Sequence, residues 1–129
     1  MVIDTSAIVA VLFDEADRAR FDRLIRDDPT RLVSAVTRVE ATFVVEGRKR
    51  EAGRERLERF FRLTAAEIEP VTPDQAELAC EAFRRFGKGR HPAALNIGDC
   101  FAYALAKATG EPLLCKGDDF PRTDLALVA

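Results

Sequence analysis

Short apolar segments alternate with longer segments of helical periodicity along this chain, and this alternation constrains the fold more than any other feature. The apolar segments predict strands at residues 2–3, 31–35, 68–71, 112–115 and 125–128. Between the strands, apolar side chains recur at helical spacing over residues 7–13, 18–26, 37–50, 57–61, 73–86 and 101–108. Strands separated by helices predict a parallel sheet covered on both faces, which is a three-layer α/β/α domain.

Polar residues and glycines mark the boundaries of the predicted helices. Thr37 and Glu40 form a capping-box pattern, which predicts that a helix begins there and continues to about residue 50. Gly53 is expected to break the helical pattern before the next helix begins. Asn96 and Asp99 form a second capping pattern ahead of the last helix.

The size and composition are those of one globular domain covering residues 1–129. Of the 129 residues, 47% are hydrophobic and 33% are charged, and the net charge is only −2. The apolar run at residues 7–13 is too short to span a membrane, so we expect a cytoplasmic protein. The three cysteines lack metal-binding or disulfide spacing and are expected to be buried, reduced thiols: Cys80, Cys100 and Cys115.

Acidic residues follow several of the predicted strands, and they are Asp4, Glu40, Asp99, Asp118 and Asp119. Asp4 comes directly after the first strand, and the last two follow the strand at residues 112–115. Glu40 and Asp99 lie in the first turns of their predicted helices. Because ligands bind beyond the carboxyl ends of parallel strands, we expect these acids to meet at one edge of the sheet.

Each of these acids also has a purely structural explanation. Glu40 and Asp99 occupy capping-box positions, and Asp118 and Asp119 suit an ordinary turn. Asp4 is harder to explain, because an acid that ends a buried strand loses hydration unless it is paired or metal-bound. Together the acids would repel one another, and a hard divalent cation relieves that repulsion. Carboxylates favour Mg²⁺ or Mn²⁺ over zinc, which prefers histidine and thiolate ligands.

A basic segment at residues 84–91 is the second feature that suggests a function. Its cations Arg84, Arg85, Lys88 and Arg90 have no acid among them, and two glycines accompany them. Because an acidic pocket repels a polyanion, a nucleic-acid substrate needs nearby cations to hold its backbone. We therefore expect Arg85, Lys88 and Arg90 to contact RNA. His91 is expected to be a neutral loop residue or a phosphate or base contact.

Residues 2–6, 85–92, 95–105 and 113–120 together resemble the VapC toxins, which are PIN-domain ribonucleases of bacterial toxin–antitoxin pairs. The resemblance covers essentially the whole chain. It implies a PIN-like fold and an acidic pocket that binds Mg²⁺ or Mn²⁺ and hydrolyses RNA phosphodiester bonds.

The family's catalytic acids fall on Asp4, Glu40 and Asp99, with the fourth on Asp118 or Asp119. Of the last two, the prediction favours Asp118, which is nearer the strand. Asp4 and Asp99 match the strongest motifs and are the expected main metal ligands. Further candidate metal ligands are Glu40, Asp118 and Asp119.

The resemblance also implies neighbours and partners. Thr5, Ser6 and Asn96 match polar positions that orient the carboxylates or the metal's water. Cys115 stands where the family would have an aromatic residue, and this departure is expected to affect packing and not the pocket. Members are held inactive by a cognate VapB-type antitoxin, whose basic side chain can enter the acidic pocket. They also tend to form homodimers, and they cut single-stranded or loop RNA, with transfer and ribosomal RNA as precedents.

Two other functions remain open at this stage. The chain could be a catalytically silent PIN-like module that binds RNA or protein, with the acids serving only as helix caps. Asp4 could alternatively be the nucleophile of an aspartate phosphatase. Such enzymes carry DxDxT after the first strand, whereas this chain carries Asp4-Thr5-Ser6.

Overall fold

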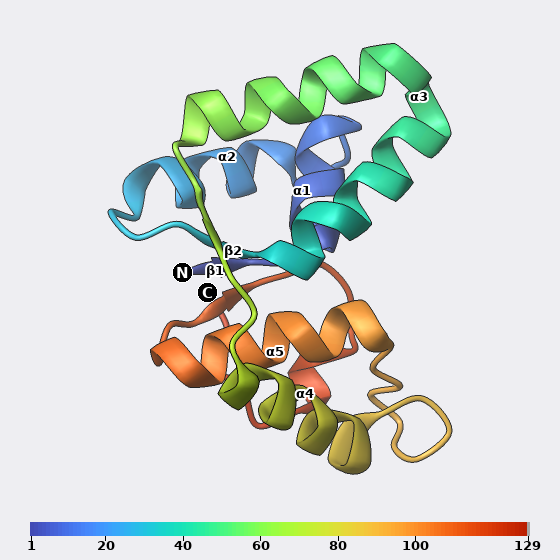
Figure 1. Cartoon of the computed structure of the whole chain (residues 1–129). Helices are drawn as coiled ribbons and strands as arrows, with labels where there is room; N and C mark the ends of the chain where they lie inside the picture. The colour runs from blue at the N-terminus through green and yellow to red at the C-terminus, as the bar shows by residue number, and fades with distance from the viewer. Residues whose placement is uncertain (129) are drawn as a thin grey trace.

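A computed structural model describes residues 1–128 and contains a four-stranded parallel sheet between two layers of helices (Figure 1). The strands lie in the order β3-β2-β1-β4. Their bounds are Val2–Ile3 for β1, Leu32–Ser34 for β2, Glu67–Glu69 for β3 and Leu113–Leu114 for β4. The predicted three-layer α/β/α arrangement is therefore confirmed.

The helices divide between the two faces of the sheet (Figure 1). One face is covered by α1 (Thr5–Leu12), α2 (Arg18–Asp27) and α3 (Ala35–Thr64), and the other by α4 (Pro73–Phe86) and α5 (Ile97–Thr109). Each layer has its own apolar core, with Ile8 and Phe21 on the first face and Leu95 and Leu105 on the second. In the described part of the chain, no helix is both long and apolar enough to span a membrane.

Helix α3 begins earlier than the capping pattern predicts. Its first residue is Ala35, and its N-cap is Ser34, whose hydroxyl accepts a hydrogen bond from the backbone N–H of Val36 at 3.3 Å. Thr37 is fully buried inside the helix, so the predicted cap there is wrong. Glu40 consequently lies in the second turn of α3, where its carboxylate can reach across the site.

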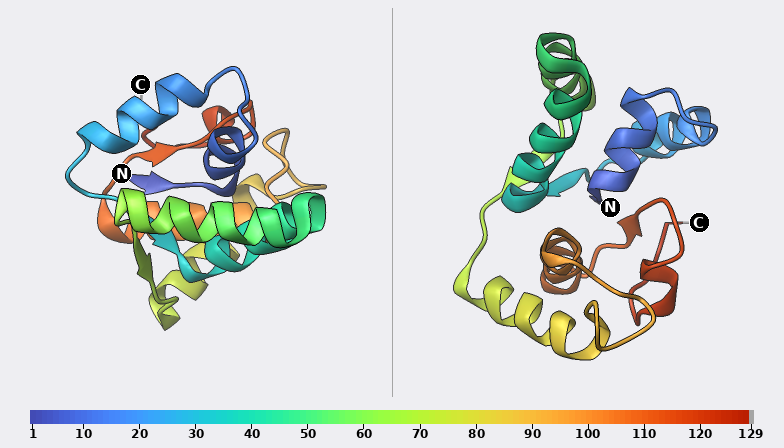
Figure 2. Two further views of the ribbon diagram at one scale, coloured as in Figure 1. Left: turned by 90° about the horizontal axis from the view of Figure 1, so that it is seen from above. Right: turned by 90° about the vertical axis from the view of Figure 1, so that its right-hand side faces the viewer.

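The predicted break at Gly53 is also displaced. The chain bends at Arg50, which has the non-helical angles φ 52° and ψ −131° inside α3. The second half of α3 then runs back alongside α1 on the same face of the sheet (Figures 1 and 2). A Cβ atom on Gly53 would lie 2.4 Å from the carbonyl oxygen of Val45. Gly53 therefore allows the two halves of α3 to pack closely and does not itself break the helix.

The C-terminal segment pairs less with the sheet than the sequence suggests. Residues 125–128 do not form a strand, and a single bridge joins Leu127 to Leu113 of β4. The predicted loop at residues 117–123 contains the short 3₁₀ helix η1 (Phe120–Arg122). Of the three cysteines, Cys100 is buried, Cys115 is half-buried and Cys80 is exposed. The expectation that all three are buried is therefore confirmed only for Cys100 and is wrong for Cys80.

Candidate metal site and nucleic-acid interface

The strand order places the end of β1 beside the end of β4. From β1 the chain order runs outward through β2 and β3 on one side, and β4 lies on the other side, so the topology reverses between β1 and β4. The backbone N–H of Asp4 bonds the carbonyl of Leu114 at 3.0 Å. Asp4 thus stands at the point of the sheet edge where α/β proteins bind ligands.

The carboxyl group of Asp4 is almost fully buried, with 3% of the residue exposed. Its Oδ2 accepts hydrogen bonds from the backbone N–H of Ser6 at 3.0 Å and from the Ser6 hydroxyl at 2.6 Å. Its Oδ1 is buried and has no hydrogen-bond partner among residues 1–128. A buried, unpartnered carboxylate oxygen is costly in a protein unless a cation compensates it, so this atom fits a metal ligand.

Glu40 reaches the same region from α3. Its Oε1 accepts a hydrogen bond at 2.5 Å from the hydroxyl of Thr5, the residue that follows Asp4 in the sequence. Its carboxylate lies against Gly98 of α5, where an added Cβ atom would be 2.1 Å from Oε2. Gly98 therefore leaves the space that Glu40 occupies, although the sequence analysis did not select it. The available signal was a glycine in the first turn of a helix, where it lowers helix stability.

Asp99 is held at the start of α5 by the predicted capping box. Its Oδ2 accepts from the backbone N–H of Asn96 at 3.0 Å, and the Asn96 side-chain oxygen accepts from the backbone N–H of Asp99 at 2.9 Å. These two bonds set the direction of the Asp99 carboxylate. Asn96 thus acts on Asp99 by orienting it.

The acids are close enough to influence each other's protonation. Burial raises the pKa of Asp4, the hydrogen bonds from Ser6 oppose this rise, and the charge of Glu40 adds to it. Burial also raises the pKa of Asp99 to about 7, with contributions from the charges of Asp4, Glu40 and Asp119. Asp4 after β1, Glu40 of α3 and Asp99 of α5 therefore lie at the same edge of the sheet, with Glu40 between Thr5 and Gly98.

The segment after β4 is tied to the β1–α1 corner. The backbone N–H of Lys116 donates to the Ser6 hydroxyl at 2.9 Å, and the Lys116 ammonium pairs with Glu15 at 2.6 Å. Asp118 and Asp119, which follow, are both exposed. Of these two acids, Asp119 is the one whose charge is among the causes that raise the pKa of Asp99.

The donor set suits a hydrated, hard cation better than a closed metal cage. Among residues 1–128, no three acidic, histidine or cysteine side chains converge into a ready-made group of ligands. Mg²⁺ commonly binds through one or two carboxylates and keeps several water molecules. The free Oδ1 of Asp4 and the adjacent carboxylate of Asp99 meet that requirement.

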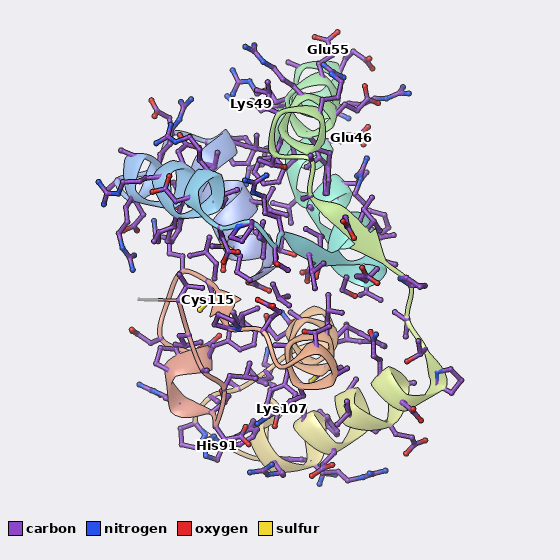
Figure 3. The ribbon with its side chains drawn as sticks, turned by 90° about the vertical axis from the view of Figure 1, so that its left-hand side faces the viewer. Glu46, Lys49, Glu55, His91, Lys107 and Cys115 are labelled. Carbon is purple, nitrogen blue, oxygen red and sulfur yellow. The ribbon has the colours of Figure 1, made fainter. Side chains whose placement is uncertain are left out.

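Cys115 follows β4 and lies near the acidic site; that its departure from the family pattern affects packing and not the pocket stays a prediction. Burial raises the pKa of its thiol to about 12, and the charges of Asp4 and Asp99 add to this effect. Figure 3 shows Cys115 near the middle of the molecule, at the end of β4. The thiol stays protonated at neutral pH and is a poor ligand for Mg²⁺.

Two of the predicted RNA contacts are engaged within the protein. The guanidinium of Arg85 lies 3.5 Å from the Asp124 carboxylate and stacks over the Phe86 ring. The Nδ1 of His91 accepts a hydrogen bond from the backbone N–H of Ala93 at 3.0 Å. Figure 3 shows His91 at the outer edge of the α4–α5 layer.

The other two predicted cations remain available to a ligand. Lys88 and Arg90 line an open groove between α4 and the start of α5, together with Arg84, which the prediction of RNA contacts had omitted. Asn96 lines the same groove and bonds Asp99. The groove therefore connects the cationic segment with the acids.

Comparison with known proteins gives a family for this fold and site. Residues 1–125 match the PIN domain, so the parallel sheet with its acidic edge is that of a PIN-domain protein. The chain is 49% identical to ribonuclease VapC30 of Mycobacterium tuberculosis over 129 residues, which are 100% of this chain and 98% of that protein. It is 48% identical to ribonuclease VapC of Mycolicibacterium smegmatis over 128 residues, which are 99% of each chain. The chain belongs to the VapC ribonuclease toxins of the PIN-domain family.

Solved structures agree with the fold. The sarcin–ricin loop cleaving toxin VapC20 of Mycobacterium tuberculosis superposes with a TM-score of 0.79 at 21% identity, covering 98% of this chain and 97% of that chain. VapBC2 of Rickettsia felis, bound to a promoter DNA fragment, gives a TM-score of 0.78 at 17% identity, covering 98% and 96%. A toxin–antitoxin complex of Klebsiella pneumoniae gives 0.70 at 18% identity, covering 98% and 95%.

Proposed function

We propose that this chain is a single-domain endoribonuclease that hydrolyses RNA phosphodiester bonds with Mg²⁺ or Mn²⁺ held by Asp4 and Asp99. The observation that carries the proposal is the buried, unpartnered Oδ1 of Asp4 beside the raised-pKa carboxyl of Asp99. When bound, the ion would lower the pKa of a water molecule and stabilise charge on the phosphate.

The protein's own groups prepare the site for this reaction. Ser6 holds Oδ2 of Asp4 and leaves Oδ1 free, and Asn96 holds Oδ2 of Asp99. Thr5 holds Oε1 of Glu40 by a hydrogen bond. We assign to Glu40 the role of orienting the attacking water. Attack by water in line with the 3′-oxygen breaks the P–O3′ bond and leaves a 5′-phosphate and a 3′-hydroxyl. Such fixed orientation contributes to catalysis because the reacting groups need no further rearrangement.

The fourth acid completes the acidic edge and is either Asp118, as the sequence resemblance suggests, or Asp119. The charge of Asp119 acts on Asp99, which favours Asp119. Its role in the proposal is to position water or the ion. Substituting each with asparagine separately distinguishes them, because only the acting residue lowers the cleavage rate.

The proposed substrate is a single-stranded or loop region of transfer or ribosomal RNA. Lys88 and Arg90 line the groove and are available for its phosphates, whereas Arg85 also pairs with Asp124 and His91 Nδ1 accepts a backbone hydrogen bond. VapC20, with the same fold, is described as cleaving the sarcin–ricin loop.

The proposed partners are a cytoplasmic VapB-type antitoxin and a second copy of this chain. Two solved structures with this fold are described as VapBC2 and as a toxin–antitoxin complex. A basic side chain of the antitoxin would neutralise Asp4 and Asp99 in place of the ion. The second copy would cover the exposed apolar side chains of Val39 and Phe43, which lie next to Glu40.

Incubation of total RNA with the wild type, Asp4→Asn and Asp99→Asn tests the proposed activity. Fragments with 5′-phosphates are expected only from the wild type and only with Mg²⁺ or Mn²⁺, and EDTA should abolish them. Each variant must first show a cooperative unfolding transition and retained RNA binding. Intact RNA with the folded, metal-loaded wild type, despite tight binding, would favour the silent binding module. Labelling of Asp4 as an acyl phosphate would favour the phosphatase.

A further inference from the structure

The groove between α4 and the start of α5 has the size and surface of a ligand site. Its volume is about 660 Å³, within the range of small-molecule pockets. Apolar side chains form most of its wall, including Ala76, Ala79, Phe83, Ile97 and Phe101. None of these apolar side chains belongs to the acidic site described above.

Phe83 is the side chain best placed to contact a flat ligand. The residue is 43% exposed, whereas phenylalanine side chains are usually buried. Its ring packs against Gly87, where an added Cβ atom would lie 2.4 Å from Cδ1. The ring is therefore held at the groove before any ligand arrives, so binding loses little side-chain entropy.

The charge around the groove has one sign. Arg84, Lys88 and Arg90 line it, and no acidic residue is among the described residues of its wall. The guanidinium of Arg90 lies 4.8 Å from the centre of the Phe83 ring. An aromatic surface flanked by cations matches single-stranded nucleic acid, in which bases stack and phosphates pair with arginine and lysine.

The groove adjoins the acids that hold the ion in the proposed function. Asn96 lines the groove and its backbone N–H bonds the Asp99 carboxylate. Cys100 also lines it, and the pKa of its thiol is raised to about 11 by burial and by the charge of Asp99. A nucleotide in the groove would consequently be a near neighbour of the phosphate at the acidic site.

We propose that this groove binds one unstacked nucleobase of the RNA substrate, next to the cleaved phosphate, against Phe83 and Ile97. Arg84, Lys88 and Arg90 then hold the adjoining phosphates. The proposal rests on the ribonuclease function and adds a position at which the enzyme reads its substrate. An apolar wall favours a base face and offers little hydrogen bonding to base edges, so the site selects for unstacked RNA more than for one base.

Binding measurements with abasic RNA test this site without any cleavage. A short single-stranded oligoribonucleotide is titrated in EDTA, and each base is removed in turn. For the wild type, one abasic position is expected to weaken binding about tenfold. Phe83→Ala should weaken binding of the intact RNA by a similar factor and show no further loss at that position. Leu63→Ala, an exposed apolar residue at the end of α3, is the matched control and should bind as the wild type does.

The same experiment identifies failure. If Phe83→Ala binds intact RNA as tightly as the wild type does, the base site is wrong and the groove serves another ligand. The same holds if removing the base weakens binding by the same factor in Phe83→Ala as in the wild type. Ile97→Ala repeats the cycle should Phe83→Ala not fold, since Ile97 is 77% exposed and contributes little to the core. Cleavage of RNA by the wild type in Mg²⁺, run in parallel, reports on the ribonuclease function separately.

Discussion

Asp4 shows at the scale of one residue how this chain is prepared for its ligand. Its backbone continues from β1, Ser6 satisfies Oδ2, and Oδ1 is buried without a partner. An arrangement chosen only for stability would pair both oxygens, because an unsatisfied buried acceptor costs about 1–3 kcal/mol. The site therefore carries a local energetic cost that a cation would relieve.

Replacing Asp99 by asparagine is expected to stabilise the metal-free protein at neutral and higher pH. The pKa of Asp99 is about 7 in the folded protein against an ordinary value of 3.8, so the folded state binds more protons between these values. Wild-type stability consequently falls as pH rises from about 4 to about 7. Asparagine removes this cost, which we set at about 1–2 kcal/mol because the side chain is partly exposed to screening solvent.

Urea unfolding in EDTA at pH 4.5 and pH 8 measures this effect. The free energy of unfolding of Asp99→Asn should exceed that of the wild type at pH 8 and approach it at pH 4.5. Asp118→Asn, an exposed acid in the loop after β4, is the control and should show no such pH-dependent difference. Equal stability of wild type and Asp99→Asn at both values would show that burial does not penalise this charge.

Gly98→Ala should reduce cleavage without destabilising the protein. The new Cβ atom would lie 2.1 Å from Oε2 of Glu40, so that carboxylate must move. Misplacement by about 1 Å can cost up to 100-fold in rate, and we expect a loss of about 10- to 100-fold. Alanine is the better helix former by about 1 kcal/mol, which should keep α5 intact.

Single-turnover cleavage in the wild-type and Glu40→Ala backgrounds separates the causes. If Gly98→Ala acts through Glu40, it has little further effect once that carboxylate is gone. An undiminished further loss in the Glu40→Ala background would mean that Gly98 acts on something else.

At the scale of the element, α3 shows where local patterns stop being sufficient. The chain keeps helical hydrogen bonding on both sides of Arg50 but reverses there at a positive φ of 52°. The position is not a glycine, so the bend must be stabilised by packing elsewhere. That packing is the close approach of Gly53 to Val45.

Two glycines of α3 form a matched pair for testing this bend. Gly53→Ala should lower the free energy of unfolding by about 1–3 kcal/mol, because its Cβ would meet the Val45 carbonyl oxygen at 2.4 Å. Gly47→Ala, with nothing within 4 Å of the new Cβ, should raise it by about 0.5–1 kcal/mol. Chemical denaturation of both variants is the measurement. A stabilising Gly53→Ala would show that the halves of α3 are not in close contact.

At the scale of the whole molecule, the acidic site joins the two helical layers. Asp4 follows β1, Glu40 belongs to α3 on one face of the sheet, and Asp99 belongs to α5 on the other. Such a set of ligands exists only when all three layers are assembled. An ion that binds there must therefore stabilise the folded state.

Added Mn²⁺ is expected to raise the melting temperature of the wild type by several degrees. An ion at about 100 times its dissociation constant adds about 2.7 kcal/mol to the free energy of unfolding. For a domain of this size, about 1 kcal/mol moves the melting temperature by about 2–4 °C. Asp4→Asn and Asp99→Asn should lose most of the shift, and Ca²⁺ and zinc serve as comparison ions. A shift that is undiminished in both variants would place the ion elsewhere.

The apolar patch beside Glu40 predicts the assembly state. Phe43 is 76% exposed and Val39 is 53% exposed on the outer side of α3. Phe43→Asp would place a charge in the proposed interface between copies and should convert a dimer into a monomer in sedimentation analysis. Leu63→Ala, exposed at the other end of α3, should leave the assembly unchanged. A wild type that is monomeric at all concentrations would remove this surface from the proposal.

Local signals in the sequence were sufficient for the layers, for the Asn96–Asp99 capping box and for the placing of acids after the strands. These features depend on side-chain periodicity and on hydrogen bonds between residues a few positions apart, so they can be read in order along the chain. Tertiary structure decided where α3 begins and bends, and it decided the contact of Glu40 with Gly98. It also decided that Arg84 lines the groove. Those features depend on how closely segments distant in the sequence approach one another, and such distances are set only when both faces of the sheet are packed.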